Sequence, residues 1–500
     1  MVEYIMNHSG KKSDLFSQSL YILLSLCVSN IIAFCISIII ARSLGPHDFG
    51  IYSLVISTQT IIFTIASLNL GNAISKFIAE LPEEQSIQQR WIARIGIEIS
   101  IVNSCVVSFL YFLLSDFIGI NIFQEMKIVS LIPFSALVII SSSIQTIIFG
   151  IAQGLKNMRI IMTMQISIQA IILLLLPILI PIIDSRAPFV AIFIAQLMVS
   201  FFVLRRLSKN GYSLSIKIPS THRASLIKMI LNYSVPGMFS ALLVNPIYWI
   251  GNTQLVLIKG FQEMALFSIA FMFYAVLLSI LPNSIILPFF PRISQFSRIS
   301  ISYIRDITET IIEKASLIFL PIFLFLAIFS MPILNILYGS VYLDAAEISF
   351  VMISTGYFCS IAAIIGSMLM GIGKMRMVLM LNIIWAISFL SVVFILVPLF
   401  GVIGLGLTYS FSYGFQVIIA FILSYEYIRL NLKRISRILL VAIFLFIVDW
   451  IIINYIIVAG QIIMITALFI FNLLLLFILY KKIYSEFLSR IIFHVHNRTN

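Results

Sequence analysis

Two ten-residue stretches decide the architecture of this chain. Residues 45–54 read GPHDFGIYSL, and residues 260–269 read GFQEMALFSI. Aligned at a shift of 215 positions, both show a glycine, an acidic residue, an aromatic residue, a serine and a closing aliphatic residue. A second match lies at a shift of 217, where GLKNMR at 154–159 corresponds to GIGKMR at 371–376. Two matches at nearly one shift predict two repeat-related halves.

The composition indicates the solvent that surrounds these halves. The chain has 500 residues, of which 61% are hydrophobic and 10% are charged, and its mean hydropathy is +1.13. A soluble protein carries about 25% charged residues. A soluble fold of this composition would leave apolar surface uncovered, so we expect an all-α polytopic membrane protein.

Apolar runs of membrane-spanning length predict the number of crossings. We expect fourteen transmembrane helices, near 18–41, 50–72, 92–114, 128–151, 160–183, 188–204, 234–257, 266–290, 315–337, 347–370, 377–398, 402–424, 438–457 and 461–480. The repeat makes span 1 correspond to span 7, so the first twelve spans form two six-helix lobes in a parallel 6+6 pseudo-repeat. Such lobes are related by an axis along the membrane normal, with a cavity between them, and two C-terminal helices are extra.

The basic residues predict the orientation of the chain and its division into segments. Both termini lie on the side that holds 27 of the 31 Lys and Arg residues, which places them in the cytoplasm. The net charge of +12 is therefore a topology signal, and we expect no nucleic-acid partner. The expected segments are an N-tail (1–17), an N-lobe (18–207), a basic cytoplasmic linker (208–233), a C-lobe (234–430), the extra helices (431–482) and a C-tail (483–500).

Several classes of function are disfavoured by what the loops and motifs contain. The outer loops are short, the longest running from Ser115 to Lys127, which leaves little room for the external catalytic domain of a glycan polymerase or ligase. Neither GxxxxGK[ST] nor GxGxxG is present, so direct use of ATP is not expected. The cysteines and histidines show no metal-ligand spacing. We therefore expect a transporter without a metal or other cofactor.

Three motifs resemble one known family. They are ARSLGPxxFGxxS at 41–53, LNLGNAISKFIAE at 68–80 and PFFPRIS at 288–294. These segments are similar to the polysaccharide transporters, the Wzx-type flippases for O-antigen and capsule repeat units. That family lies in the superfamily of multidrug (MATE) exporters and lipid II flippases, the MOP superfamily.

The resemblance implies a mechanism, a location and partners. Two six-helix lobes would alternate between inward- and outward-open states in the bacterial inner membrane. They would carry an undecaprenyl-diphosphate-linked oligosaccharide from the inner to the outer leaflet, beside a polysaccharide polymerase and a chain-length regulator. Coupling to H⁺, to Na⁺ or to the membrane potential stays open. A MATE-type drug exporter is the alternative, although the sequence places no acid near a span centre within the twelve-span core.

Candidate substrate-binding residues come in pairs. Lys76 and Arg292 close the repeat-related spans 2 and 8, where they would attract a diphosphate or simply be positive-inside charges. Asn30 and Asn245 match at the 215 shift in spans 1 and 7, where amides would bind sugar hydroxyls or join helices. A third pair, one helical turn apart at the start of span 3, would contact substrate or form an internal ion pair. That third pair is Arg94 and Glu98.

Further residues are candidates for movement and coupling. Pro246 predicts a hinge in span 7, and Pro236 and Pro282 are further kink candidates. Asp449 is a carboxylate deep in span 13, suited to ion coupling or to an interface. The first span, 18–41, carries no charge, unlike the arginine-bearing first span of the lipid II flippases, which favours a neutral or modestly charged glycan. The outer-loop repeat motif comprises Arg42, Gly45, Asp48, Gly50, Gly260 and Glu263.

Overall fold

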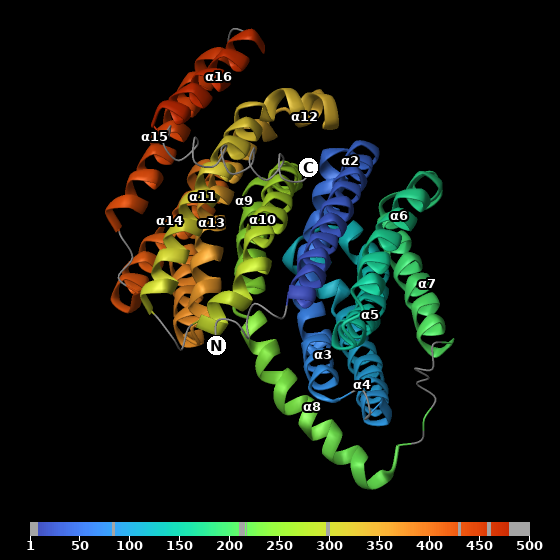
Figure 1. Cartoon of the computed structure of the whole chain (residues 1–500). Coiled ribbons are helices and arrows are strands. Elements are labelled where there is room, and N and C mark those ends of the chain that lie inside the picture. The colour runs from blue at the N-terminus through green and yellow to red at the C-terminus, as the bar shows by residue number, and fades with distance from the viewer. Residues whose placement is uncertain are drawn as a thin grey trace, which may run out of the picture.

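The computed structural model describes residues 9–82, 86–209, 216, 218–296, 301–428, 432–457 and 462–479, and every regular element in these ranges is a helix (Figure 1). The first half holds α2 (Ser9–Ser67), α3 (Leu70–Glu80), α4 (Ser86–Leu113), α5 (Met126–Gly154), α6 (Met158–Ile183) and α7 (Ala187–Lys209). The second half holds α8 (Ser220–Ala241), α9 (Asn245–Lys259), α10 (Phe261–Phe296), α11 (Ile301–Ile328), α12 (Ser330–Tyr338), α13 (Ala345–Gly371), α14 (Met375–Ile428), α15 (Leu432–Ile457) and α16 (Ile462–Leu479). Three short turns complete it, η2 (Phe117–Ile122), η3 (Asp184–Arg186) and η4 (Ser340–Tyr342).

Two of the helices are too long to cross a membrane once. Helix α2 has 59 residues, about 90 Å at 1.5 Å per residue, against a hydrocarbon core of about 30 Å. It is broken at Gly45, whose φ of 75° and ψ of 170° lie in a region that is essentially restricted to glycine. Helix α14 has 54 residues and is broken at Gly401, with φ 60° and ψ −133°. Each of the two therefore supplies two helical segments of membrane length.

The apolar helices show a multi-pass membrane protein. Within the described residues, eight continuous helical stretches are long and apolar enough to cross a membrane. Three of these have 51 to 56 residues, about twice the length that one crossing needs. Two shorter apolar helical stretches follow, at Leu439–Ile452 and Thr466–Phe477. The expected membrane class is confirmed, while the expected count of fourteen crossings stays a prediction.

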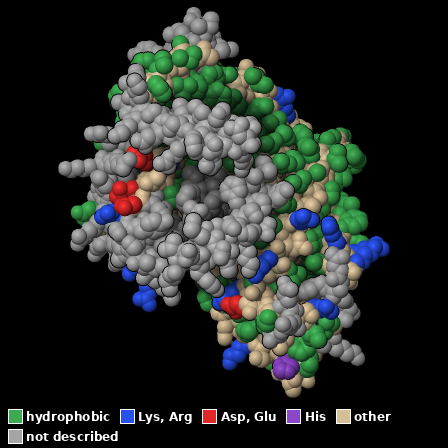
Figure 2. Space-filling model, in the orientation of Figure 1, with side chains coloured by type: hydrophobic (Ala, Val, Ile, Leu, Met, Phe, Trp, Pro, Cys, Tyr) green, Lys and Arg blue, Asp and Glu red, His purple; other side chains and the backbone are tan. Residues whose placement is uncertain are grey.

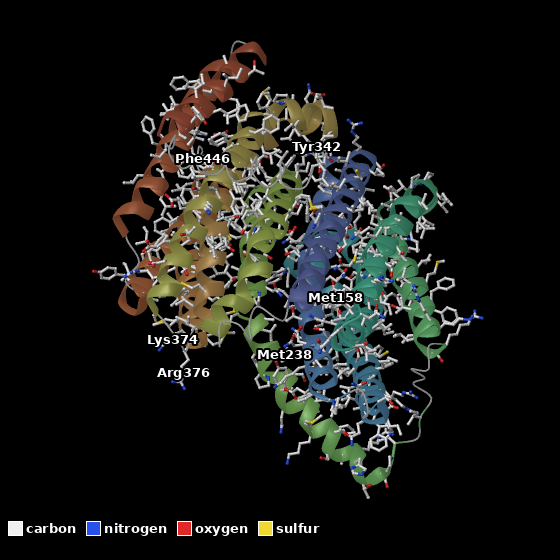
Figure 3. All side chains as sticks on the ribbon, viewed as in Figure 1. Met158, Met238, Tyr342, Lys374, Arg376 and Phe446 are labelled. Atoms are coloured by element: carbon white, nitrogen blue, oxygen red, sulfur yellow. The ribbon has the colours of Figure 1, made fainter. Side chains whose placement is uncertain are left out.

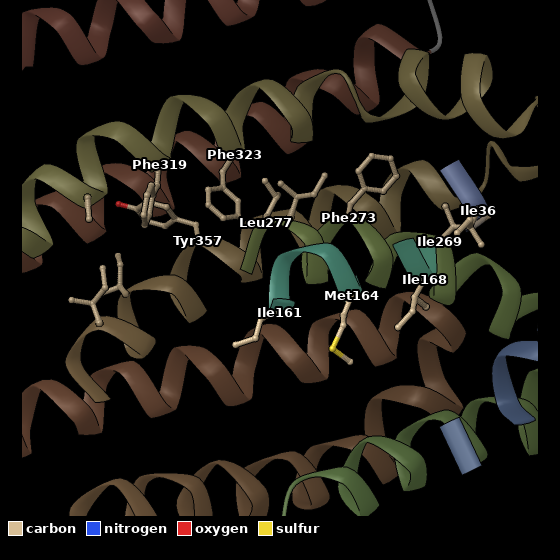
Figure 4. Packing of buried hydrophobic residues seen from close by; sticks show 14 of the residues in the cluster. Ile36, Ile161, Met164, Ile168, Ile269, Phe273, Leu277, Phe319, Phe323 and Tyr357 are labelled. Carbon is tan, nitrogen blue, oxygen red and sulfur yellow. The ribbon is translucent and has the colours of Figure 1, made fainter. Parts of the chain in front are cut away.

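The two halves lie side by side. In Figure 1 helices α2 to α7, in blue to green, stand beside helices α10 to α16, in green to red, and α2 packs against α10 along the junction. The buried core continues through this junction, as Figure 4 shows for Ile36 of α2, Met164 of α6, Phe273 of α10 and Phe323 of α11. Among the side chains coloured by type in Figure 2, hydrophobic ones cover most of the upper part and the right flank, and most of the Lys and Arg side chains lie in the lower half.

Span 7 is divided into two helices. Helix α8 ends at Ala241, three turn residues follow, and α9 begins at Asn245. Pro246 lies in the first turn of α9, where its missing N–H costs no helical hydrogen bond. The break stands where the bend in span 7 was expected, although the hinge motion stays a prediction. Helix α8 begins at Ser220, so the stretch expected to be a basic linker is helical in part.

The other two kink candidates lie inside helices. Pro236 belongs to α8, and Pro282, which is buried, belongs to α10. Helix α8 runs obliquely below the first half in Figure 1, from the end of α7 toward the second half. Helix α9 packs against α14, in the second half. Span 7 therefore connects the two halves.

Candidate functional site

A cavity of about 480 Å³ lies between the two halves. Its walls come from α2, α9 and α10, with one residue each from α12 and α14. The volume falls in the range of about 300–1,000 Å³ that is typical of small-molecule sites. The lining residues are Ala33, Ile36, Ser37, Ile40, Phe49, Tyr52, Ser53, Ile56, Ser57, Thr60, Asn245, Tyr248, Asn252, Met264, Phe267, Ser268, Ile269, Phe271, Met272, Tyr338 and Tyr409.

Most of this lining obeys the 215-residue shift found in the sequence. Fourteen of the 21 lining residues form seven pairs at that shift. The pairs are Ala33 with Tyr248, Ser37 with Asn252, Phe49 with Met264, Tyr52 with Phe267, Ser53 with Ser268, Ile56 with Phe271, and Ser57 with Met272. The cavity therefore lies where corresponding segments of the two halves face each other.

The lining is uncharged, and it mixes polar side chains with a larger apolar surface. All 21 residues are neutral, and many of the polar ones are Ser, Thr or Asn. Several hydroxyls already donate their single proton to a carbonyl one turn back in their own helix. Ser53 donates to Phe49 O at 2.8 Å, and Ser268 donates to Met264 O at 2.8 Å. A hydroxyl that has donated its proton still offers its lone pairs, so these positions accept hydrogen bonds from a ligand.

Glycines allow α2 and α10 to approach closely beside the cavity. A Cβ atom at Gly50 would collide with the carbonyl of Phe261, so only a glycine allows α2 and α10 to approach so closely. Gly45 and Gly260 adopt nearly the same conformation, with φ 75° and ψ 170° in the first and φ 89° and ψ −179° in the second. Glycine alone reaches this region readily. The repeat motif thus has the same backbone geometry in both halves.

Three hydrogen bonds tie α2 to the second half at the end predicted to face outward, and we call them the outer clasp. Arg42 donates from Nη2 to Ile336 O at 2.7 Å, and Tyr342 donates its hydroxyl proton to Ala41 O at 2.7 Å. The hydroxyls of Ser37 and Tyr338 lie 2.8 Å apart. Tyr342 lies at the end of the molecule opposite to Lys374 and Arg376 (Figure 3).

The two acidic residues of the outer motif make local contacts. Asp48 lies 2.8 Å from Nζ of Lys127, which starts the neighbouring helix α5. Glu263 accepts a hydrogen bond from the backbone N–H of Val402 at 3.3 Å, just after the break in α14. Both carboxylates therefore contact the first turn of a helical segment, and neither belongs to the lining of the cavity.

A second set of hydrogen bonds joins α2 to α9, and we call it the α2–α9 seam. Asn245 donates from Nδ2 to Thr64 Oγ1, Trp249 from Nε1 to Thr58 Oγ1, and Asn252 from Nδ2 to Ser57 Oγ, each at 2.9 Å. Asn245 thus lines the cavity and also joins the halves. Its expected counterpart Asn30 lies outside the lining and donates to Leu26 O of its own helix at 2.8 Å.

The expected cationic residues lie at the end opposite to the outer clasp, on α3 and α4. Lys76 places its Nζ 4.2 Å from the ring centroid of Tyr233 on α8, a cation–π contact. Arg94 donates from Nε to Glu98 at 2.9 Å, so the ion pair within span 3 is present. The side chain of Arg292 lies outside the described residues, although its backbone belongs to α10.

Helix α8 extends the ion pair of α4. Arg223 donates from Nη2 to Glu98 Oε2 at 2.7 Å, and Arg94 also donates to the carbonyl of Ile216. The ring of Trp91 stacks on His222, with centroids 5.6 Å apart. These contacts fasten α8 and the residues before it to α4. In this structure Arg94 and Glu98 therefore hold α8 in place, and they lie outside the lining of the cavity.

Asp449 lies apart from the cavity lining. Its carboxylate is fully buried and accepts from Nδ2 of Asn472 at 2.8 and 2.9 Å. The contact joins α15 to α16. Of the two roles open for Asp449, the geometry fits an interface between helices; ion coupling is untested.

Sequence reasoning missed the aromatic part of the lining. Tyr248, Phe267, Phe271 and Tyr409 line the cavity and touch one another in the second half. The 215-residue shift could have found the first three, since they correspond to lining positions of span 1 and span 2. No sequence signal points to Tyr409, which lies on α14 and reaches the cavity only through the fold.

Comparisons with known proteins place the chain among its relatives. The model of the family described as "Polysaccharide biosynthesis protein" matches residues 15–297, more than half of the chain. A segment of 47 residues is 49% identical to the sporulation protein YkvU of Bacillus subtilis (strain 168). This segment covers 9% of the chain and 11% of that protein, so the likeness is local.

Solved structures share the whole fold. The lipid II flippase MurJ, in an inward closed conformation, matches with a TM-score of 0.72 at 14% identity, covering 93% of this chain and 99% of that one. An inward-facing multidrug resistance MATE transporter of the MOP superfamily matches with a TM-score of 0.68 at 16% identity, covering 84% and 98%. At these identities the likeness shows the fold. With the family match over residues 15–297, it shows that this chain belongs to the polysaccharide biosynthesis protein family and has the fold of MurJ and the MATE transporters.

Proposed function

We propose that the protein is a flippase for lipid-linked oligosaccharides. It carries undecaprenyl-diphosphate-linked repeat units of a surface polysaccharide, such as O-antigen or capsule, from the inner to the outer leaflet of the bacterial inner membrane. The observation that carries this proposal is the uncharged cavity between the two repeat-related halves, which has hydroxyl and amide groups in its lining and the outer clasp at one end. The family match supports the link to polysaccharide synthesis.

The chemistry of the substrate makes such a cavity necessary. A charge at the centre of a bilayer costs at least about 2.5–3.5 kcal/mol. Each sugar hydroxyl that loses water without a new partner adds roughly 1–3 kcal/mol. A cavity with hydroxyl and amide groups replaces that lost water. The lipid tail can remain in the bilayer during the crossing.

The transport cycle follows from the contacts between the halves. With the outer clasp and the α2–α9 seam formed, the cavity is closed toward the outside, and substrate enters from the cytoplasmic leaflet. Outward opening breaks the hydrogen bonds of the clasp and brings the cytoplasmic ends together. Span 7, already broken before Pro246, is the connection that bends. The seven repeat-related pairs in the lining support the parallel 6+6 arrangement.

The proposal includes fourteen crossings with both termini in the cytoplasm. The long helices α2 and α14 supply two crossings each, and α6 with α7 forms a 52-residue apolar stretch interrupted at η3. Helices α8 and α9 together form the broken span 7, while α15 and α16 lie beyond the core. The positive-inside distribution of Lys and Arg sets the orientation. A polymerase and a chain-length regulator are the expected partners on the outer side.

A multidrug exporter is the second candidate, because MATE transporters share the fold. Lipophilic cations are favoured by acidic groups in a binding cavity, whereas all 21 residues that line this one are uncharged. The chemistry of the lining therefore favours the sugar substrate.

A deletion of the gene in its native host tests the function. We expect loss of surface polysaccharide, with complete repeat units accumulating on their lipid and facing the cytoplasm. Single repeat units that appear outside but stay unpolymerised would instead identify a polymerase. Normal surface glycan with new drug sensitivity would identify an exporter.

Complementation of the deletion strain tests the cationic mouth of the cavity. We expect Lys76→Ala to lower surface polysaccharide severalfold, because Lys76 lies where span 2 meets α8 at the basic end. The matched control is Arg376→Ala, which removes a cation at the same end (Figure 3). An equal effect of the two variants would show that Lys76 acts only through the general excess of positive charge.

A further inference from the structure

The two walls of the cavity differ in chemistry although they are repeat-related. The wall from α2 contributes small side chains and hydroxyls, namely Ala33, Ser37, Ser53, Ser57 and Thr60, beside the rings of Phe49 and Tyr52. The wall from the second half contributes a larger cluster of rings, namely Tyr248, Phe267, Phe271, Tyr338 and Tyr409, beside the polar side chains of Asn245, Asn252 and Ser268. At four of the seven pairs the first half has the smaller residue and the second half the larger one. The cavity thus has a hydroxyl wall and an aromatic wall.

The hydroxyl wall offers acceptors and few free donors. Ser53 donates to Phe49 O, Thr60 donates to Ile56 O at 2.9 Å, and Ser37 donates to Phe34 O at 2.8 Å. A hydroxyl has one proton, so each of these groups can only accept from a ligand. A ligand that brings its own O–H or N–H donors satisfies this wall. A carboxylate or phosphate has acceptors alone and does not.

The aromatic wall is held rigid from behind. The rings of Tyr248 and Tyr409 are stacked, with centroids 5.4 Å apart and planes 3° apart. The hydroxyls of Tyr248 and Tyr413 lie 2.6 Å apart, and Trp385 meets Tyr248 edge-on at 5.3 Å. An aromatic face is electron-rich and attracts the weakly positive C–H bonds of an apolar surface. A sugar ring has such a surface on the face that its axial hydrogens cover.

We propose that this cavity is a subsite for an uncharged, hydroxyl-rich sugar ring. The flat C–H face of the ring lies against the aromatic wall, and the hydroxyls at its edge donate to the hydroxyl wall. A carboxylate on the sugar finds no cation among the lining residues to offset its charge, and it is disfavoured there. The diphosphate stays outside this subsite. The inference rests on the proposed flippase function and names the class of its substrate.

The experiment uses the purified full chain in proteoliposomes with two matched probes. The probes are undecaprenyl-diphosphate-glucose and undecaprenyl-diphosphate-glucuronic acid, which differ only in a hydroxymethyl group against a carboxylate. We expect the glucose lipid to be flipped at least tenfold faster. Binding is followed separately by tryptophan fluorescence, because Trp249 and Trp385 stand beside the cavity-lining residues. Tighter binding of the glucose lipid is expected as well.

Variants test whether the preference for the glucose lipid over the glucuronic acid lipid depends on the two walls. Tyr248→Leu removes a ring of the aromatic wall and should slow flipping of the glucose lipid at least tenfold. Its matched control is Phe411→Leu, since Phe411 is 54% exposed on the outer surface of α14 and should leave the rate within twofold. Ser53→Lys adds a cation to the hydroxyl wall and should narrow or reverse the preference between the probes. If Ser53→Lys is folded and its ratio of the two flipping rates differs from that of the wild type, the substitution acts on substrate selection and not on stability alone.

The outcomes separate this inference from the proposed function. Equal flipping of both probes, unchanged in Ser53→Lys, would overturn the neutral-sugar subsite while leaving the flippase intact. Selective binding of the glucose lipid without any flipping would support the subsite and overturn the flippase function. Binding that Tyr248→Leu and Phe411→Leu weaken equally would overturn the role of the aromatic wall.

Discussion

Asn245 and Asn30 occupy corresponding positions in the two halves, yet the structure uses them differently. Asn245 joins the halves through Thr64 and lines the cavity, whereas Asn30 donates to its own helix. The sequence could place both amides in the middle of a span. It could not tell which of them faces the other half, because that depends on how the lobes meet. The repeat therefore predicts where along its span each amide lies, but only the tertiary structure determines which residue that amide contacts.

Gly50 is the single residue on which the approach of the halves most depends. We expect Gly50→Ala to destabilise the protein by about 1–3 kcal/mol, because its Cβ would collide with the rigid carbonyl of Phe261. The measurement is the thermal unfolding midpoint in detergent, together with the rate of flipping. The control is Gly366→Ala, where a Cβ meets open space. Equal midpoints for the two variants would contradict the close contact of α2 and α10.

A substitution at Asp449 tests whether this buried carboxylate couples transport to an ion gradient. We expect Asp449→Asn to keep flipping within twofold of the wild-type rate, because its described partner is Asn472, at the contact of α15 and α16. The measurement compares flipping with and without an imposed proton or sodium gradient. If a gradient accelerates the wild type and Asp449→Asn abolishes that response, the interfacial role is wrong.

At the scale of elements, the sequence anticipated the break in span 7 but not where its first part lies. Pro246 marks the start of α9, and the structure breaks the helix directly before it. Helix α8 packs on the first half through Trp91 with His222 and through Glu98 with Arg223. The two residues of each pair are more than a hundred positions apart along the chain, so no local sequence pattern predicts that they are in contact. Arg94 and Glu98 could be predicted as a pair, but not as the anchor of another helix.

An engineered disulfide can fix α8 to the junction of α2 with α3, and we call this disulfide the α8 lock. A Cβ built on Gly237 of α8 lies 3.5 Å from Cβ of Asn69, within the range of about 3.5–4.5 Å found in disulfides. We expect Asn69→Cys/Gly237→Cys to form a disulfide under mild oxidation. The bond is detected by its reversible shift in electrophoretic mobility. The two single-cysteine variants are the controls, and they also account for the four native cysteines. A double variant that resists oxidation would contradict the docking of α8.

For the whole molecule, the resemblance of three motifs predicted the family, while composition and repeat predicted a membrane protein with two related halves. They also predicted a cavity between the halves, and the 215-residue shift reappears in its walls. The aromatic wall was beyond the sequence, because aromatic side chains at helical spacing are as common in a lipid-facing or core position as in a cavity. The roles of Lys76 and Arg292 remain predictions for the same reason. Only contacts distinguish a cation at a mouth from one at a membrane surface.

The rate of outward transport should depend on the membrane potential. Moving a negative charge outward across an inside-negative membrane is favourable by about 2.3 kcal/mol per charge per 100 mV. If the diphosphate crosses this field, collapse of the potential with valinomycin and potassium should slow outward flipping of the lipid-linked sugar. The rate in cells or proteoliposomes with a clamped potential measures this. A rate that does not change with the potential would show that the diphosphate does not cross the field.

The central claim is that the two halves move past each other to carry a lipid-linked sugar. In the proposed cycle this movement bends span 7 and takes α8 off the junction of α2 with α3, so the α8 lock, which holds α8 there, tests the claim most directly. Proteoliposomes containing Asn69→Cys/Gly237→Cys are loaded with undecaprenyl-diphosphate-glucose, and its appearance in the outer leaflet is followed before and after reduction. We predict that the oxidised protein is at least tenfold slower than the reduced one, while both single-cysteine variants flip at the wild-type rate in either state. Flipping at an undiminished rate with the disulfide formed would contradict the account.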